Sequence, residues 1–154
     1  MKQRLYLDTS VFGGYFDQEF EDFTKPLFER IILGEFTILY SSITQQELMA
    51  APAKVQNLVL DLKEEHTDWL SLSKEALELA GHYLSEGVVG KTSFVDCQHI
   101  AMATIYHADL LISWNFKHIV NIERIRGYNS VNIKFGYRNL EIRSPRDLMH
   151  YEND

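Results

Sequence analysis

The stretch Leu5-Tyr6-Leu7-Asp8-Thr9-Ser10 carries a short apolar run directly into an aspartate. Apolar runs at residues 37–40, 95–105 and 110–113 precede or contain a further polar side chain, and these side chains are Glu47, Asp96 and Asn115. The carboxyl ends of strands in an open α/β sheet share one edge, so residues just past several strands converge there although they are distant in sequence. Converging carboxylates repel one another unless a positive charge lies between them. The pattern therefore predicts a site for Mg²⁺ or Mn²⁺, which are hard cations that take oxygen ligands.

Length and composition predict one compact domain over residues 1–154. The chain has 154 residues, of which 45% are hydrophobic, enough for a core that needs no disulfide. Cys97 is the single cysteine, so no internal disulfide can form and a reducing compartment is expected. The first apolar run stops at Asp8, which is too short for a secretory signal or a membrane span. We therefore expect a cytoplasmic protein with no membrane association.

The formal charge of −7 gives no overall attraction for a polyanion, so any contact with nucleic acid must be local. Basic residues gather between residues 117 and 146, where they alternate with aromatic side chains. Such a mixture can bind phosphates and stack bases. A solvated or partner-facing loop is the alternative. The candidate RNA-binding residues are Arg124, Arg126, Lys134 and Arg138.

Strand-like and helix-like segments alternate along the chain. The expected strands are residues 4–7, 36–41, 67–72, 110–113 and 140–143, and helical spacing lies between them. Thr24 can cap the first long helix, with Gly34 as its stop. Parallel neighbours need crossover connections, so this alternation predicts a three-layer α/β/α sandwich around a mostly parallel sheet. Residues 121–137 alternate poorly and contain Gly127, Asn129 and Gly136, so we expect a loop or hairpin there.

Each candidate ligand also has an ordinary structural explanation. Asp8 could form an Asx turn, and Asn115 could be a turn residue. Glu47 could close a capping box with Thr44, and Asp96 could do the same with Ser93. Separate explanations would seldom bring all of these residues to one sheet edge, so their combination favours the metal site.

The chain resembles a PIN domain, the metal-dependent nuclease fold that includes VapC-type toxins. Leu5-Tyr6-Leu7-Asp8-Thr9-Ser10-Val11 is similar to the opening hydrophobic-Asp-Thr-Asn motif, and residues 41–48 are similar to the motif of the second acid. Residues 96–103 resemble the aspartate that begins an Ala-rich helix, and residues 111–116 resemble the strand that leads to the fourth polar position. The resemblance implies a five-stranded parallel sheet, a Mg²⁺ or Mn²⁺ site and single-stranded RNA as the substrate.

Carried over by position, the resemblance makes Asp8, Glu47 and Asp96 the acidic ligands and Asn115 the fourth member of the site. Asn115 stands where the family often has aspartate, so a second ion should bind more weakly. Ser10 stands where asparagine is frequent. Ser10 and Ser113 are expected to bind the scissile phosphate or to hold the acids. Ordinary turn roles are the alternative for both serines.

The expected reaction is phosphodiester hydrolysis by a metal-activated water. The expected partners are RNA, an antitoxin if the protein is the toxin of a type II toxin–antitoxin pair, and a second copy in a homodimer. A catalytically weakened PIN-like module that binds RNA or protein is the alternative. A phosphatase that uses Asp8 as nucleophile is disfavoured, because Ser10 stands where such enzymes carry a second aspartate. His99 and His118 are expected not to bind the metal.

Overall fold

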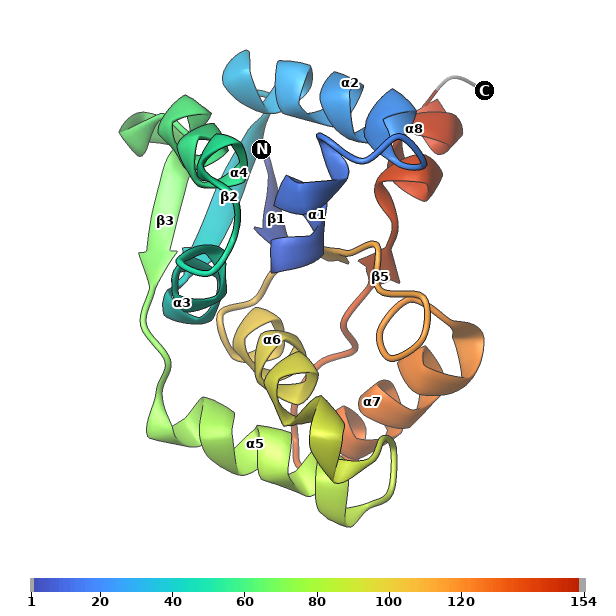
Figure 1. Ribbon diagram of the computed structural model, residues 1–154. Coiled ribbons are helices and arrows are strands. Elements are labelled where there is room, and N and C mark those ends of the chain that lie inside the picture. The colour runs from blue at the N-terminus through green and yellow to red at the C-terminus, as the bar shows by residue number, and fades with distance from the viewer. Residues whose placement is uncertain (1, 153–154) are drawn as a thin grey trace.

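A five-stranded parallel sheet forms the centre of the molecule in the computed structural model, which describes residues 2–152 (Figure 1). The strand order is β3-β2-β1-β4-β5, with β1 in the middle. Leu5 of β1 lies opposite Ile38 on one side and Leu110 on the other, and every pairing is parallel. The predicted parallel sheet is therefore confirmed. The strands are β1 (Gln3–Leu7), β2 (Phe36–Ser41), β3 (Thr67–Leu70), β4 (Leu110–Ile112) and β5 (Ile142–Arg143).

Alternate residues of the strands face two separate cores. Tyr6 packs among side chains of α5, α6 and α7, whereas Leu5 and Leu7 pack on the opposite face with side chains of α1, α2, α4 and α8. Figure 1 shows these two groups of helices on either side of the sheet. The predicted three-layer sandwich is confirmed. The helices are α1 (Thr9–Gly14), α2 (Glu21–Ile32), α3 (Ser42–Leu48), α4 (Ala53–Asn57), α5 (Lys74–Ser85), α6 (Phe94–Ile105), α7 (Ile122–Lys134) and α8 (Pro145–Glu152), with short 3-10 turns η1 (Leu58–Asp61), η2 (Glu64–His66) and η3 (Lys91–Ser93).

The loop or hairpin expected over residues 121–137 is wrong, because α7 occupies this segment. The Asn121 side chain caps the helix by accepting a hydrogen bond from the Arg124 N–H at 2.9 Å. The apolar periodicity of α7 is weak because a polar residue lies on its inner face. Asn132 is fully buried there and accepts a 2.5 Å hydrogen bond from the Tyr83 hydroxyl. Gly127 is a packing glycine, since a Cβ there would lie 2.8 Å from Cγ1 of Val88. Gly136 follows the helix with a φ of 85°.

The expected start of the first long helix is also wrong. The helix α2 begins at Glu21, and Thr24 lies inside it, where its hydroxyl donates to the Phe20 carbonyl at 2.8 Å. Thr24 also accepts a hydrogen bond from the Trp114 indole, so its hydroxyl serves packing between segments rather than capping. The predicted stop at Gly34 is confirmed, with a φ of 79° that favours glycine.

The parallel order places the carboxyl ends of all strands at one edge of the sheet. The helices α1 and α3 begin directly after β1 and β2, and residues 113–121 follow β4 at the same edge. The candidate site residues follow these strand ends or lie on α6, whose buried side chains share a core with Leu111 of β4. Within residues 2–152, no helix is both long and apolar enough to span a bilayer.

Candidate active site

Asp8 is the first residue after β1 and is buried, with an exposed fraction of 4%. Its side chain makes no capping bond to α1, so the Asx-turn explanation does not hold. The Ser10 hydroxyl donates to Oδ1 at 2.6 Å, and the Ser113 hydroxyl donates to Oδ2 at 2.5 Å. Each carboxylate oxygen has two lone pairs. Asp8 therefore keeps acceptor capacity on both oxygens after these bonds are made.

Ser10 and Ser113 hold the Asp8 carboxylate from two different strand ends. The Ser10 hydroxyl oxygen accepts from the Trp114 N–H at 2.8 Å, and the Ser113 hydroxyl oxygen accepts from the Asn115 N–H at 2.9 Å. Because each hydroxyl accepts from the backbone, its own hydrogen is free to point at Asp8. Of the expected roles, the geometry supports holding the acid.

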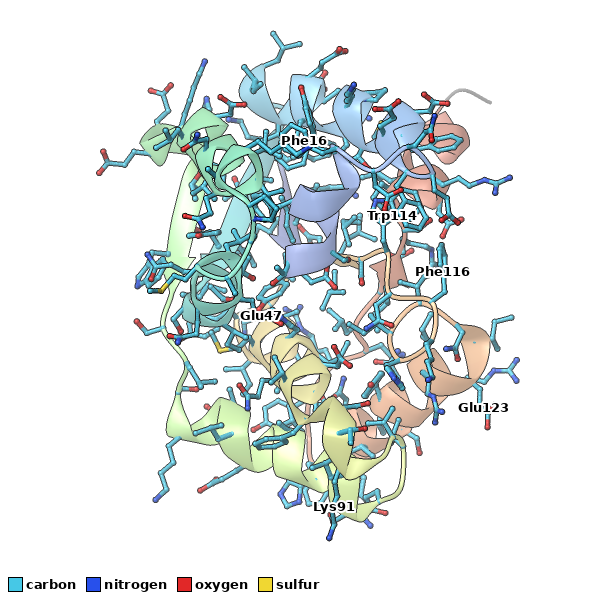
Figure 2. All side chains as sticks on the ribbon, in the orientation of Figure 1. Phe16, Glu47, Lys91, Trp114, Phe116 and Glu123 are labelled. Carbon is cyan, nitrogen blue, oxygen red and sulfur yellow. The ribbon has the colours of Figure 1, made fainter. Side chains whose placement is uncertain are left out.

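Glu47 lies in the last turn of α3, at the end that approaches α6 (Figure 2). Its Oε1 accepts from the Thr9 hydroxyl at 2.6 Å and contacts His99 Nε2 at 2.6 Å. The capping-box explanation for Glu47 does not hold, because Ser41 caps α3 by accepting from the Thr44 N–H. Glu47 thus connects the residue after Asp8 with the helix that carries Asp96.

His99 belongs to this cluster, although from the sequence we expected only that it would not bind the metal. It is buried on α6, and its Nδ1 lies 2.7 Å from the Tyr6 hydroxyl. The signal in the sequence was its position one helical turn after Asp96, on the same face of the helix. What the sequence did not contain was the partner, since Glu47 lies 52 residues away.

Asp96 and Asn115 complete the arrangement at the start of α6. The Asn115 Nδ2 donates to Asp96 Oδ1 at 3.3 Å, while its Oδ1 accepts from the His118 N–H at 2.9 Å. Asn115 therefore presents a donor to Asp96, and its amide oxygen is used in a turn. Ser93 makes no side-chain cap, so the capping box proposed for Asp96 does not form. His118 Nδ1 is buried without a hydrogen-bond partner among the described residues.

The electrostatics of the site favour a cation. Burial raises the pKa of Asp8 and of Asp96, although the nearby His99 charge acts in the opposite direction. Burial also opposes ionisation of Glu47, but hydrogen bonds from His99 and Thr9 outweigh it and lower the pKa of that carboxyl. Among the described residues, no lysine or arginine forms an ion pair with any of these three carboxylates.

The donor set fits Mg²⁺ or Mn²⁺ in its chemistry, because it offers desolvated carboxylate oxygens and little competing positive charge. The arrangement of these side chains fits a metal ion less well than their chemistry does. Across residues 2–152, no three side chains from His, Cys, Asp and Glu are gathered in a form that could hold a metal ion. Contacts link the predicted residues in pairs, through Thr9, His99 and the Asp96–Asn115 bond, rather than around one point.

The predicted basic surface is divided in the structure. The Arg124 guanidinium donates to the Val88 carbonyl, and Lys134 forms an ion pair with Glu86. Arg138 lines a hollow with His107 and Asp109, at the end of β4 opposite to Asn115. Arg126 is exposed on the first half of α7 and pairs with no described residue.

Comparisons with known proteins agree with this fold. No protein-family model and no curated protein sequence matches the chain. A chain in the structure of VapBC2 from Rickettsia felis, bound to a DNA fragment from their promoter, is similar with a TM-score of 0.56 and 18% identity, covering 92% of this chain and 98% of that one. A chain in the structure of FitAB bound to an IR36 DNA fragment has a TM-score of 0.56 and 14% identity, covering 92% and 94%. The resemblance to VapC-type PIN domains is thus confirmed at the level of the fold.

Asp8→Asn should stabilise the metal-free protein at neutral pH. The pKa of Asp8 is raised on folding, so its ionisation opposes folding once the pH exceeds the ordinary carboxyl range of about 4. The neutral amide removes this penalty, and each kcal/mol recovered should raise Tm by about 2–4 °C in a domain of this size. Thermal unfolding in EDTA measures the effect, with the exposed Asp61→Asn as the control.

The gain in Tm should shrink as the pH is lowered through about 4, because the wild-type carboxyl then becomes protonated in the unfolded state as well as in the folded state. A lower Tm for Asp8→Asn at neutral pH would contradict the burial of an unbalanced charge at this position.

Proposed function

We propose that the protein is a Mg²⁺- or Mn²⁺-dependent endoribonuclease that hydrolyses phosphodiester bonds in single-stranded RNA. The observation that carries the proposal is that Asp8, Glu47 and Asp96 lie near one another at the carboxyl edge of the sheet, and that no lysine or arginine among residues 2–152 forms an ion pair with them. Their links run in pairs, through Thr9, His99 and Asn115. Buried carboxylates without such a partner favour a divalent cation as their counter-charge.

Asp8 and Asp96 are the proposed principal ligands, with Glu47 as the third. When bound, the metal would lower the pKa of a coordinated water and neutralise charge on the phosphate. Ser10 and Ser113 keep Asp8 in place by donating to both of its oxygens. Asn115 donates to Asp96, and its neutral side chain adds no negative charge to the fourth position. A single strongly bound ion follows from this charge count.

We further propose that the protein acts in the cytoplasm as the toxin of a type II toxin–antitoxin pair, with an antitoxin partner and a homodimeric assembly. The support is the likeness to chains in the VapBC2 and FitAB structures. Large apolar side chains are also exposed, including Leu33, Met49 and Leu60 at 77%, 71% and 81%. Exposed apolar side chains of this size are available to a protein partner.

Asp8→Asn and Asp96→Asn should each abolish metal-dependent cleavage of a labelled single-stranded RNA. Removing a direct ligand should reduce the rate by more than the roughly 100-fold that loss of an outer partner typically costs. Cleavage assays in Mn²⁺, Mg²⁺ and EDTA measure the effect, and Asp61→Asn should cleave as the wild type does. Undiminished cleavage by purified Asp8→Asn would reject the assignment.

Arg126→Ala should weaken RNA binding without regard to sequence and flatten its salt dependence. One lost phosphate contact reduces the slope of log affinity against log salt by about 0.7 for a single strand. The matched control is Lys134→Ala, because that ammonium already pairs with Glu86. Binding to a catalytically inactive variant, titrated between low and moderate salt, gives the slope. An equal slope for wild type and Arg126→Ala would show that Arg126 does not contact RNA. The same comparison, made with alanine at Arg124 and at Arg138, tests whether those residues contact RNA.

The second candidate function is a PIN-like module that binds RNA or protein but cleaves poorly, which the donor presented by Asn115 to Asp96 favours. Asn115→Asp distinguishes the two. A second carboxylate beside Asp96 should lower Tm in EDTA through repulsion, and it should raise the gain in Tm on adding Mn²⁺ together with the cleavage rate. If neither wild type nor Asn115→Asp cleaves RNA in Mn²⁺, the binding module is the better account.

A further inference from the structure

A buried chain of hydrogen bonds connects the interior of the sheet with Glu47. The Tyr6 hydroxyl lies 2.7 Å from the Ser41 hydroxyl and 2.7 Å from His99 Nδ1, and His99 Nε2 lies 2.6 Å from Glu47 Oε1. Ser41, Tyr6 and His99 are at most 2% exposed. Water therefore has little access to the chain, and its members must satisfy one another.

The positions of the hydrogens follow from counting donors. Tyr6 carries one hydroxyl hydrogen, which a phenol retains at neutral pH. If Tyr6 donates to His99 Nδ1, the neutral imidazole carries its hydrogen on Nε2. If Tyr6 donates to Ser41 instead, Nδ1 must donate to Tyr6, and the ring carries a hydrogen on both nitrogens. In both arrangements Nε2–H donates to Glu47, because a carboxylate only accepts.

One oxygen of Glu47 is consequently saturated. Oε1 accepts from His99 Nε2 and from the Thr9 hydroxyl, both at 2.6 Å, and these two bonds use its two lone pairs. Oε2 has no hydrogen-bond partner among the described residues, and the Glu47 side chain is 39% exposed. Glu47 therefore offers one oxygen to a ligand, and its orientation depends on His99 and Thr9.

We propose that His99, oriented by Tyr6, is a positioning residue that together with Thr9 fixes Glu47 so that Oε2 alone serves as a single-oxygen ligand for the divalent cation. The inference rests on the proposed metal-dependent function. Hydrogen-bonded partners of ligating carboxylates fix ligand orientation and contribute to metal affinity. The competing account is that His99 only fills the core, where its ring packs edge-on against Tyr6 with centroids 5.6 Å apart.

The first test measures Mn²⁺ affinity, by electron paramagnetic resonance of the unbound ion, in full-length protein. His99→Ala should bind Mn²⁺ about 10- to 100-fold more weakly than wild type. His99→Gln should recover part of the loss, because its amide can donate to Oε1. Tyr6→Phe should lie between wild type and His99→Ala. Tyr83→Phe is the matched control, since it removes another buried tyrosine hydroxyl, the one bonded to Asn132, away from the acids.

The second test needs no metal. Long-range ¹⁵N–¹H spectra of the metal-free protein should show a hydrogen on His99 Nε2, and Glu47→Ala should make that hydrogen exchange faster with water. A pure packing role would leave Mn²⁺ affinity unchanged in every folded variant, in His99→Ala and Tyr6→Phe as well as in His99→Gln, whatever happened to stability.

The outcomes separate two failures. Wild type that binds Mn²⁺ with an affinity equal to that of folded His99→Ala and Tyr6→Phe overturns the positioning role and leaves the proposed function intact. Wild type that binds no Mn²⁺ overturns the proposed function and the ligand role of Glu47 with it. An Nε2 without hydrogen overturns the donor assignment itself. If His99→Ala does not fold, the Gln and Phe variants decide the question.

Discussion

The burial of the Asp8 carboxylate at the end of the central strand is the constraint on which the rest of the site depends. A carboxylate removed from water is costly unless it is hydrogen-bonded or paired with a positive charge. Two serine hydroxyls satisfy the Asp8 oxygens, but they add no charge, and burial still raises the pKa of Asp8. The fold therefore keeps an acid where its ionised form is unfavourable, which is typical of functional rather than structural positions.

The surrounding residues show how the fold maintains that acid. Its hydroxyl donors come from two segments, since Ser10 lies in α1 and Ser113 follows β4, so the pairing of β1 with β4 is needed to assemble them. Thr9, the residue after Asp8, donates a hydrogen bond to Glu47. His99 contacts Glu47 through Nε2 and the buried Tyr6 hydroxyl through Nδ1. The second acid is thus tied to the same central strand as the first, although it lies on α3 and its hydrogen-bond partners Thr9 and His99 lie on α1 and α6.

The parallel sheet could be predicted from the sequence because the signals that mark its strands are local. A short apolar run followed by a polar residue recurs at β1 and β4, and the intervening helices leave parallel pairing as the simple solution. The segment of α7 was misjudged because Gly127 and Asn129 are typical of loops, whereas in the structure Gly127 packs against Val88 and Asn129 accepts a hydrogen bond from the Leu140 N–H. Those contacts exist only between distant segments. The bond between His99 and Glu47, and the turn that occupies the Asn115 oxygen, are likewise tertiary facts that no spacing reveals.

In the proposed site, Asp8 and Asp96 share a divalent cation. Anomalous diffraction from a crystal soaked in Mn²⁺ tests it most directly, because the ion is located independently of any assay. We expect a single strong peak within about 2.3 Å of a carboxylate oxygen of each aspartate, close to the usual bond lengths of small divalent ions. A crystal with no peak near Asp8, or with a lysine or arginine side chain in that position, would contradict it.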